Sequence, residues 1–534
     1  MNRPTAQRPM LPLEPMRLAA WAILTALLVA GAFTPGRAAE LYAGDDISIR
    51  WDNTVRYSAG FRVNPRDHYY NYEPNNDDGD RDFSPGLISN RLDLLSVLNI
   101  SRDNFGVQAS IAAWYDTVYH GRTDNNSPAT YNPASVPDFQ FARATRDLHG
   151  QHAEIGDTFV YGTFSLEDVP VSVRIGRQTL LWGESLFFSH DGIAATQAPV
   201  DYIKSYISPG GYSKNVFLPM NQISLSVQPR SDLTLAFYYQ LEWRPARLPG
   251  VGSYFSYVDF FGAGAERILL GPQDYLHHGK DRSPRDGQFG ASLHANFDDL
   301  DVGFYALKYN AKYPVVRFAA NESPVSSAND LGVFNLIYPS GIELYGASFS
   351  TYAGDATIAG EISARRHMPL TVRPLLASYA GAYYAGHGYP EGDTLHAQFS
   401  TVETFAPERV WDSADLNAEF TANYLIGVTR GASAVDPSRD RFAASARLLF
   451  EPRYFETLPN LDISFPVGLG VNMAGRSSVD YTQNGGTGDF ELGVAATYRS
   501  VWKASLTLTS FWGTPDSQPL TDRDFVLLSI ERTF

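Results

Sequence analysis

The residues best suited to ion chemistry in this sequence of 534 residues are acidic and stand close together. The run NNDDGDRD (75–82) has enough carboxylates to hold calcium, but it lacks the glycine and the distal glutamate of an EF-hand at the required spacing. We therefore interpret it as a solvated loop. His149 and His152 could also contact a metal, yet no further ligand can be assigned to them. The sequence predicts no metal site and no cofactor.

Catalytic motifs are missing from the chain. There is no Gly-x-Ser-x-Gly, no phosphate loop and no His-Glu-x-x-His, so we predict no catalytic residue and no enzyme. The chain has no cysteine, which excludes disulfides and thiolate metal sites. Its formal net charge of -16 gives no electrostatic footprint for nucleic acid.

Many other charged residues occur at every second position of extended segments, where they alternate with apolar ones. From Ile47 to Val63, nearly all odd positions are apolar and nearly all even positions are polar or charged. This period of two is typical of a β-strand with one apolar and one polar face. The same alternation recurs at 233–243, 289–297 and 416–426, and at many other places along the chain.

The segment WKASLTLTSFW (502–512) indicates that the apolar face of such a strand contacts membrane lipid. It carries a tryptophan at each end of one apolar face. Ten steps of about 3.3 Å, tilted by about 40°, span about 25 Å, which is the height of the apolar band of a membrane barrel. Tryptophan favours the headgroup level of a membrane, where its apolar ring and its polar N–H are both satisfied.

The connections between the segments alternate in length. Short turns are expected at 101–104, 165–170, 229–232, 298–299 and 353–355, with long loops at 64–88, 119–152, 183–221, 244–287 and 311–341. Outer-membrane barrels alternate short periplasmic turns with long extracellular loops in this way. With a further strand at 394–405, the sequence predicts an all-β, antiparallel, transmembrane outer-membrane barrel of about 18 strands. Totals of about 16 or 20 stay open, because one misassigned strand shifts the count by two.

The two ends of the chain fit export to an outer membrane. Residues 1–38 combine early arginines, an apolar run and small residues before a cleavage point, which predicts a cleavable signal peptide. The remaining 39–534 show no low-complexity linker, so we predict one barrel domain. The chain closes on the alternating segment DFVLLSIERTF, and we interpret Phe534 as the terminal aromatic that the barrel-assembly machinery of Gram-negative bacteria recognises.

The polar faces of these strands would point into the barrel lumen. The predicted lumen-facing charges are Arg50, Arg56, Arg62, Arg91, Asp93, Arg174, Glu242, Glu361, Arg365, Glu419, Arg447, Glu491 and Arg499. They could select ions or substrates, but we favour a structural network of paired charges. Their mixed signs argue against a strongly anion- or cation-selective pore.

Two loops are candidates for a part in transport. The segment 182–220 lacks strand alternation and has apolar residues at helical spacing in PVDYIKSYI (199–207), so it is a possible lumen plug, with an external cap as the alternative. The loop 247–270 is unusually apolar for a surface, with Tyr254, Phe255, Tyr257, Phe260 and Phe261. Exposed apolar patches tend to bind something, so these five form a candidate entrance for a hydrophobic ligand. The alternative is packing on the barrel rim or against lipopolysaccharide.

Four stretches of the chain resemble the proteobacterial family called domain of unknown function 1302 (DUF1302). They lie at 86–116, 146–164, 171–188 and 242–256, and the resemblance extends over nearly the whole chain. Members look like exported β-barrels, often encoded beside an inner-membrane transporter of the RND type and a second exported protein. The resemblance implies envelope transport and brings no catalytic motif with it.

We therefore expect a channel or conduit for hydrophobic or amphipathic small molecules in the outer membrane of a Gram-negative bacterium. Its expected partners are outer-membrane lipid and lipopolysaccharide, the barrel-assembly machinery, an RND-type transporter and a periplasmic protein, and no nucleic acid. One alternative is a structural or partner-docking envelope component without transport. An outer-membrane hydrolase with a spatial Ser–His pair is a weaker alternative.

Overall fold

The computed structural model describes residues 39–43, 46–67, 73–188, 190–208, 216–284, 287–319, 328–372 and 389–534. Residues 1–38, for which the sequence predicts a signal peptide, lie outside these ranges. Among the described residues, no helix is long and apolar enough to cross a membrane.

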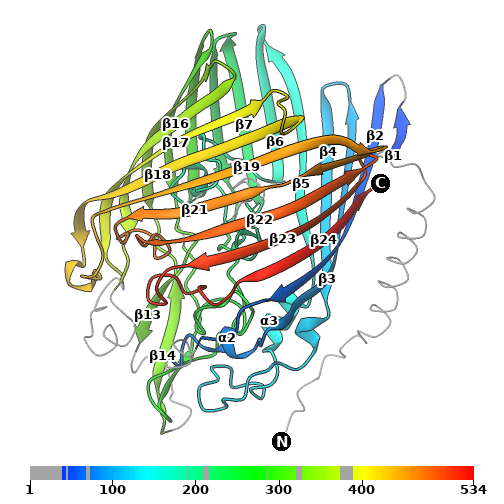
Figure 1. Cartoon of the computed structure of the whole chain (residues 1–534). Helices are drawn as coiled ribbons and strands as arrows, with labels where there is room; N and C mark the ends of the chain where they lie inside the picture. The colour runs from blue at the N-terminus through cyan, green and yellow to red at the C-terminus, as the bar shows by residue number, and fades with distance from the viewer. Residues whose placement is uncertain are drawn as a thin grey trace, which may run out of the picture.

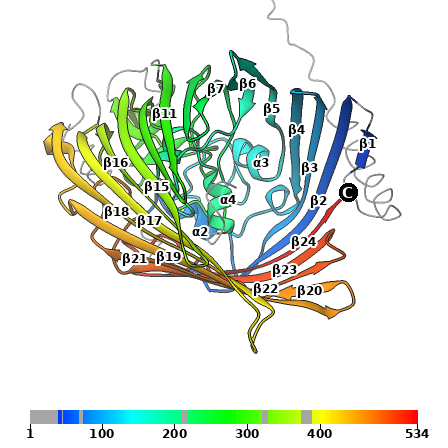
Figure 2. The same ribbon diagram turned by 90° about the horizontal axis from the view of Figure 1, so that it is seen from above.

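The alternating segments form one closed, antiparallel β-barrel of 18 strands (Figures 1 and 2). The described sheet contains 20 strands, but β1 pairs only with β2, and β20 and β21 are two parts of one barrel strand, so 20 − 2 = 18. The last strand, β24, pairs antiparallel with β2 and closes the ring. The predicted fold class and strand number are confirmed.

The barrel strands follow one another around the ring in chain order. The first nine are β2 (Ile47–Arg62), β3 (Gly86–Arg102), β4 (Phe105–Asp116), β5 (Gln151–Leu166), β6 (Val169–Gln178), β7 (Met220–Arg230), β8 (Leu233–Gln240), β11 (Gln288–Phe297) and β12 (Leu300–Tyr309). The others are β15 (Ile342–Ala353), β16 (Ala356–Pro369), β17 (Glu391–Phe405), β18 (Ser413–Arg430), β19 (Phe442–Leu458), β20 (Leu461–Ser464) with β21 (Val467–Ala474), β22 (Thr487–Tyr498), β23 (Trp502–Trp512) and β24 (Phe525–Thr533). The short β1 (Ala39–Ala43) lies beside the start of β2.

The two faces of the wall differ as the alternation predicts. On β16, β17 and β18, the outward residues Ile362, Phe399 and Phe420 are 49%, 47% and 41% exposed. Their chain neighbours Glu361, Gln398 and Glu419 point inward and are at most 7% exposed. An apolar exterior with a polar interior is the arrangement of a barrel that spans a membrane.

Short turns join the strands at one end of the barrel, and long loops join them at the other (Figure 1). Two-residue hairpin turns favour positive φ at both positions, because this geometry matches the twist of the strands. Glu167 and Asp168 adopt φ values of 49° and 70° in one such turn. The chain end lies at the short-turn end, where Phe534 and Asn53 exchange two backbone hydrogen bonds of 2.9 Å.

The long loops carry a second, small sheet and several short helices. The sheet consists of β9 (Arg267–Leu269), β10 (Tyr275–His278), β13 (Val315–Ala319) and β14 (Asp330–Ile337). The helices are α2 (Asp78–Arg81), α3 (Arg143–His149) and α4 (Tyr202–Ile207), with single 3-10 turns η2 (Val118–His120), η3 (Ile193–Thr196) and η5 (Ala432–Ala434). Figure 2 shows α4 and its neighbouring coil within the ring of strands, so loop residues occupy the barrel interior.

Candidate functional site: a loop anchored inside the barrel

The candidate site is the connection between β6 and β7, residues 179–219, which we call the lumen loop. Its described residues are 179–188, 190–208 and 216–219. Residues 184–188 and 190–193 of this loop hydrogen-bond to inward side chains of three neighbouring strands, β16, β17 and β18. The lumen loop therefore lies inside the barrel, as a plug and not as an external cap.

Glu361 of β16 holds two separated points of the lumen loop. Its carboxylate accepts hydrogen bonds from the backbone N–H of Glu184 and of Ile193, both at 2.7 Å. Gly183 lies directly against this carboxylate, with φ of +87°, and a Cβ atom there would stand 2.2 Å from Glu361 Oε2. The close approach and the left-handed backbone both require glycine at this position.

Glu419 of β18 accepts three successive backbone hydrogen bonds. Oε1 accepts from the N–H of Leu186 at 3.0 Å, and Oε2 accepts from Phe187 at 2.6 Å and from Phe188 at 2.8 Å. A buried carboxylate is expensive unless hydrogen-bond donors compensate for its lost hydration. Here the backbone of the lumen loop supplies these donors, so the loop and the wall stabilise each other.

Arg365 of β16 satisfies the carbonyl groups of the next residues. Its guanidinium donates to the carbonyl oxygens of His190 and Gly192, at 3.2 and 3.1 Å, and also to that of Asp191. The side chain is 2% exposed. The five donors of a guanidinium suit it to bind several carbonyl groups at once.

Asp191 is the polar centre of the anchored segment. Its carboxylate contacts His396 Nδ1 at 2.9 Å and accepts hydrogen bonds from Thr421 Oγ1 at 3.0 Å and Gln483 Nε2 at 2.6 Å. Asn423 Nδ2 adds a fourth contact at 3.2 Å. This set ties the lumen loop to β17, to β18 and to the loop between β21 and β22.

The contacts of His396 resemble a catalytic triad in outline. Its Nδ1 contacts Asp191, and its Nε2 lies 3.0 Å from Thr394 Oγ1. Thr394 and His396 are 0% and 2% exposed, so no substrate reaches the hydroxyl in this arrangement. We therefore assign the three residues to the anchoring of the loop.

The lumen loop also has an apolar side. Ile193 is fully buried against Tyr238, Tyr305 and Leu344, which face inward from β8, β12 and β15. In contrast, Leu186, Phe187 and Phe188 are only half-buried, although they lie inside the barrel. The carboxylate of Glu419 fixes their backbone while their side chains keep part of their apolar surface open.

The predicted lumen-facing charges fall into groups by contact. Glu361, Arg365 and Glu419 hold the lumen loop, as described above. Other predicted charges form ion pairs with residues of opposite charge along the barrel wall. The pairs are Arg56 and Arg91 with Asp93 at 3.6 and 2.6 Å, Arg447 with Asp489 at 2.5 Å, and Arg177 with Glu242 at 3.6 Å. Arg174 lies over the ring of Phe159, and Glu491 of β22 is half-buried beside Gly468.

Three of the predicted charges occupy other positions. Arg62 is buried among the long loops, where it pairs with Asp80 and Asp522 at 2.7 Å each. Arg499 lies in the turn between β22 and β23 with φ of 53°, because the strand ends at Tyr498. Arg50 is near the short-turn end and pairs with Asp52 at 2.8 Å.

The apolar loop 247–270 is not an exposed patch, contrary to the expectation from its composition. Tyr254, Phe255 and Phe260 are at most 7% exposed, and Tyr257 and Phe261 are half-buried. Tyr254 and Phe255 pack with Phe525 at the seam of the barrel, and Phe260 packs under the small sheet. The apolar side chains of this loop therefore form the core of the loop assembly, which is the packing alternative.

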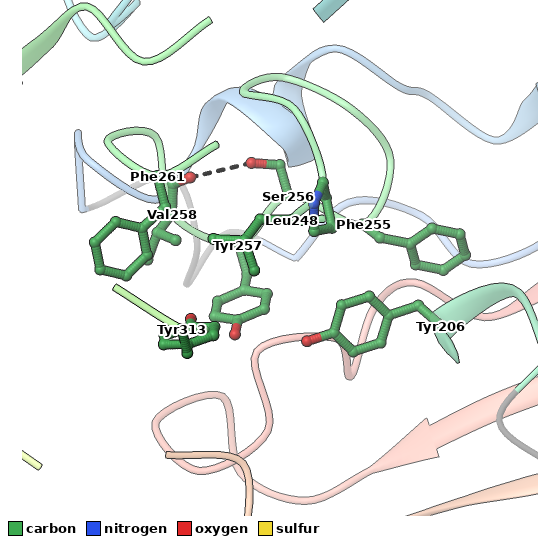
Figure 3. Close-up of a pocket in the computed structure, with 9 residues that line it drawn as sticks. Tyr206, Leu248, Phe255, Ser256, Tyr257, Val258, Phe261 and Tyr313 are labelled. Atoms are coloured by element: carbon green, nitrogen blue, oxygen red, sulfur yellow. Dashed lines mark hydrogen bonds between the residues drawn. The ribbon is translucent and has the colours of Figure 1, made fainter. Parts of the chain in front are cut away.

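A small cavity remains between this loop and α4. Phe255, Tyr257 and Phe261 line it together with Tyr206 and Tyr313 (Figure 3). Its volume is about 20 Å³, which is room for about one water molecule. In this structure the cavity cannot hold a hydrophobic ligand.

The acidic run 75–82 is also buried, so its interpretation as a solvated loop is wrong. Asp77, Asp78 and Asp80 are 0% exposed, and Asp82 is 3% exposed. They lie beneath residues 253–259 of a loop distant in sequence, since a Cβ on Gly79 would stand 2.7 Å from the carbonyl oxygen of Ser253. The composition of a loop does not show whether a loop distant in sequence will bury it.

Sequence reasoning missed several residues of the site. The sequence pattern does not single out Asp191, Thr421, Asn423 or Gln483, because short polar side chains are common in loops and on polar strand faces. Gly183 offered a usable signal, since a glycine between bulky residues in LLWGESLFF indicates a turn or a close approach.

No curated protein matches the sequence. Among solved structures, the chain is similar to OccAB3 of Acinetobacter baumannii, with 8% identity, coverage of 91% of this chain and 99% of that one, and a TM-score of 0.44. It is similar to OccAB1 of the same organism, with 12% identity, 93% and 99% coverage and a TM-score of 0.44. OccK2 (OpdF) of Pseudomonas aeruginosa, in complex with glucuronate, has 11% identity, 91% and 98% coverage and a TM-score of 0.40.

The sequence also matches a family model described as a protein of unknown function, DUF1302, over residues 19–534. This match confirms the resemblance carried by the stretches at 86–116, 146–164, 171–188 and 242–256. Since it covers nearly the whole chain, the protein belongs to the DUF1302 family.

Proposed function

We propose that the protein is a channel of the Gram-negative outer membrane that conducts amphipathic or hydrophobic small molecules past its lumen loop. A barrel of 18 strands encloses more space than its own inward side chains fill. The lumen loop occupies part of this space and sets the chemistry of the path. The observation that carries the proposal is the half-buried apolar segment Leu186–Phe188 inside the barrel, which keeps part of its surface accessible.

A permeant in this path meets two kinds of surface. Leu186, Phe187 and Phe188 offer apolar contact, while paired charges such as Arg91 and Asp93 line the wall. Paired charges attract neither anions nor cations strongly, whereas apolar side chains favour a permeant with an apolar part. This combination supports an amphipathic substrate over a small inorganic ion.

The experiment compares wild type with the double variant Phe187→Ser and Phe188→Ser in proteoliposomes. We expect the double variant to lose permeability to amphipathic aromatic solutes at least about tenfold, or about 1.4 kcal/mol, while permeability to small sugars is retained or rises. The control is Phe399→Ser, which changes an outward phenylalanine on the same region of wall. Equal solute selectivity of the double variant and wild type would remove the proposed role of the apolar segment.

The proposed partners are an RND-type inner-membrane transporter and a second exported protein, on the basis of the family resemblance. Lipid, lipopolysaccharide and the barrel-assembly machinery are the proposed partners of the barrel itself. Affinity capture from membranes of the native organism after cross-linking tests the transporter partnership. Recovery of the protein without any RND component would count against it.

One observation favours a second function, a scaffold that does not conduct. The anchors at Glu361, Arg365 and Glu419 fix the lumen loop at many points, as expected of a permanent plug. Planar bilayer recordings separate the two functions, because a scaffold gives no current steps for wild type.

A further inference from the structure

The extracellular loops contain an acidic cluster with too few positive charges. Asp77 and Asp78 come from the loop between β2 and β3, and Asp259 comes from the loop after β8. All three are 0% exposed, and one oxygen of each lies within 4.8 Å of the others. Calcium binds oxygen ligands at about 2.3–2.6 Å, so two ligands of one ion stand up to about 5 Å apart.

The described arginines near this cluster pair with Asp77 or with carboxylates outside the cluster, and none of them pairs with Asp78 or Asp259. Arg81 pairs with Asp77, and both Arg62 and Arg523 lie against Asp80. In the part of the chain that the structure describes, no salt bridge is formed by Asp78 or Asp259. Two buried carboxylates therefore stand side by side without a counter-charge, which is costly unless a cation or a proton joins them.

Oxygen atoms of this cluster and of its neighbour Asn132 are buried without hydrogen-bond partners among the described residues. Asn132 is 0% exposed, and its backbone N–H donates to Asp78 Oδ2 at 3.0 Å. Its side-chain Nδ2 donates to Asn75 Oδ1 and to the carbonyl of Arg267, but its Oδ1 has no hydrogen-bond partner among the described residues. Asp78 Oδ1 and Asp259 Oδ1 are also buried without a partner. Buried acceptors left unpaired by the protein in this way are suited to bind a cation.

Electrostatics agrees with this geometry. Burial, together with the charges of Asp259, Asp82 and Asp77, raises the pKa of Asp78 well above its usual value. Burial and the charge of Asp77 raise the pKa of Asp259 in the same direction. A divalent cation would relieve both effects, because it favours the ionised form of its ligands.

From these contacts we propose that Asp77, Asp78, Asp259 and Asn132 bind one divalent cation, preferentially Ca²⁺. All four ligands are hard oxygens from carboxylates and an amide, and no His or Cys belongs to the set, which suits Ca²⁺ better than Zn²⁺. The ion links three separate extracellular loops, since Asn132 lies between η2 and α3. It thereby fixes the assembly that covers the mouth of the barrel, independently of what the barrel conducts.

The test uses full-length protein refolded in detergent without lipopolysaccharide, because lipopolysaccharide itself binds divalent cations. After EGTA treatment, we expect Ca²⁺ to raise the thermal midpoint by several degrees, roughly 5 °C at saturation, with one site per chain. We also expect Tb³⁺ bound at the site to luminesce on tyrosine excitation, because Tyr131 adjoins Asn132, and Ca²⁺ to quench this signal by displacement. An extracellular site of this kind would bind Ca²⁺ with a Kd of about 0.1–1 mM.

The variants Asp78→Asn and Asp259→Asn distinguish a metal site from a protonated cluster. Each should weaken Ca²⁺ binding at least about tenfold. In EGTA each should be at least as stable as wild type, because it removes an uncompensated buried charge, and in Ca²⁺ wild type should be the more stable protein. The control Asp274→Asn changes an exposed carboxylate of a nearby loop and should leave both measurements unchanged.

Two results would overturn the proposal. One is a wild-type midpoint that 10 mM Ca²⁺ does not move and an absence of Tb³⁺ luminescence, which would mean that the carboxyl groups hold protons. The other is stabilisation by Mg²⁺ but not by Ca²⁺, which would overturn the choice of ion.

Discussion

At the scale of single residues, Glu419 differs from the paired charges that the sequence predicts for the lumen. It meets no cation in a salt bridge within the described chain, and its partners are three backbone N–H groups of the lumen loop. A charge on the wall thus serves to position a loop. The strength of that anchoring can be measured.

We predict that Glu419→Gln loosens the lumen loop without unfolding the barrel. The amide keeps one acceptor oxygen and places an NH2 group against two backbone donors, which should cost about 2 kcal/mol of local stability. This corresponds to roughly 30-fold faster amide hydrogen exchange in the peptide that contains 186–188. Glu451→Gln is the matched control, because Glu451 pairs with Arg453 and not with the loop. Unchanged exchange in Glu419→Gln would contradict the anchoring role.

A second residue-scale prediction concerns Lys312, which is 7% exposed and contacts the carbonyl of Thr196 at 3.2 Å. Burial lowers its pKa to about 7. Between pH 7 and 10 the unfolded chain holds a proton that the folded protein lacks, so the free energy of unfolding should rise with pH, by up to about 1.4 kcal/mol per pH unit. Urea unfolding of wild type and Lys312→Met at pH 7 and 9 checks the difference.

Lys308→Met serves as the control, because Lys308 is a half-buried residue of β12. It should follow the wild-type pH dependence. A Lys312→Met variant that also follows wild type would show that this lysine is not neutral in the folded protein near pH 8.

At the scale of elements, strands were predictable and the loop assembly was not. One face of a barrel strand contacts lipid and the other faces the lumen, so apolar and polar residues alternate along it. The alternation from Ile47 to Val63 therefore predicts β2 directly. The inward fold of 182–220 was one of two open alternatives, because Glu361 lies 168 and 177 residues from its partners in the loop, and Glu419 lies 231–233 residues from its partners.

The two loop predictions that were wrong share a cause. Phe255 and Asp78 were both expected at a surface, one for apolar contact and the other for solvation. The structure buries both in the same assembly over the barrel mouth, with Asp78 N–H donating to Asp259 Oδ2 at 3.2 Å. Composition shows what a loop contains, but burial depends on which distant loop covers it. For long loops of a barrel, exposure therefore cannot be predicted from local sequence.

At the scale of the whole molecule, one seam decides whether the sheet is a barrel. Every other pair of barrel neighbours is also close in chain order, but β2 and β24 join the two ends of the wall. Their register runs from Thr54↔Thr533 to Arg62↔Phe525. The apolar exterior and the enclosed lumen loop both depend on this closure, since an open edge would leave backbone groups unpaired in lipid.

A disulfide across the seam tests the closure directly, and the natural absence of cysteine makes the background clean. Thr54 and Thr533 face each other with hydroxyl oxygens 3.0 Å apart, so Thr54→Cys with Thr533→Cys should oxidise readily. The bond would close a loop of 479 residues and stabilise the barrel by about 5 kcal/mol or more in the chain-entropy model. Non-reducing electrophoresis of the boiled protein should show the faster-migrating cyclic form.

In the control Thr54→Cys with Ser529→Cys, the second cysteine stands four residues away from position 533 along β24, about 13 Å distant, and should stay reduced. Cross-linking of the control pair instead of the first pair would mean that β24 meets β2 in a different register.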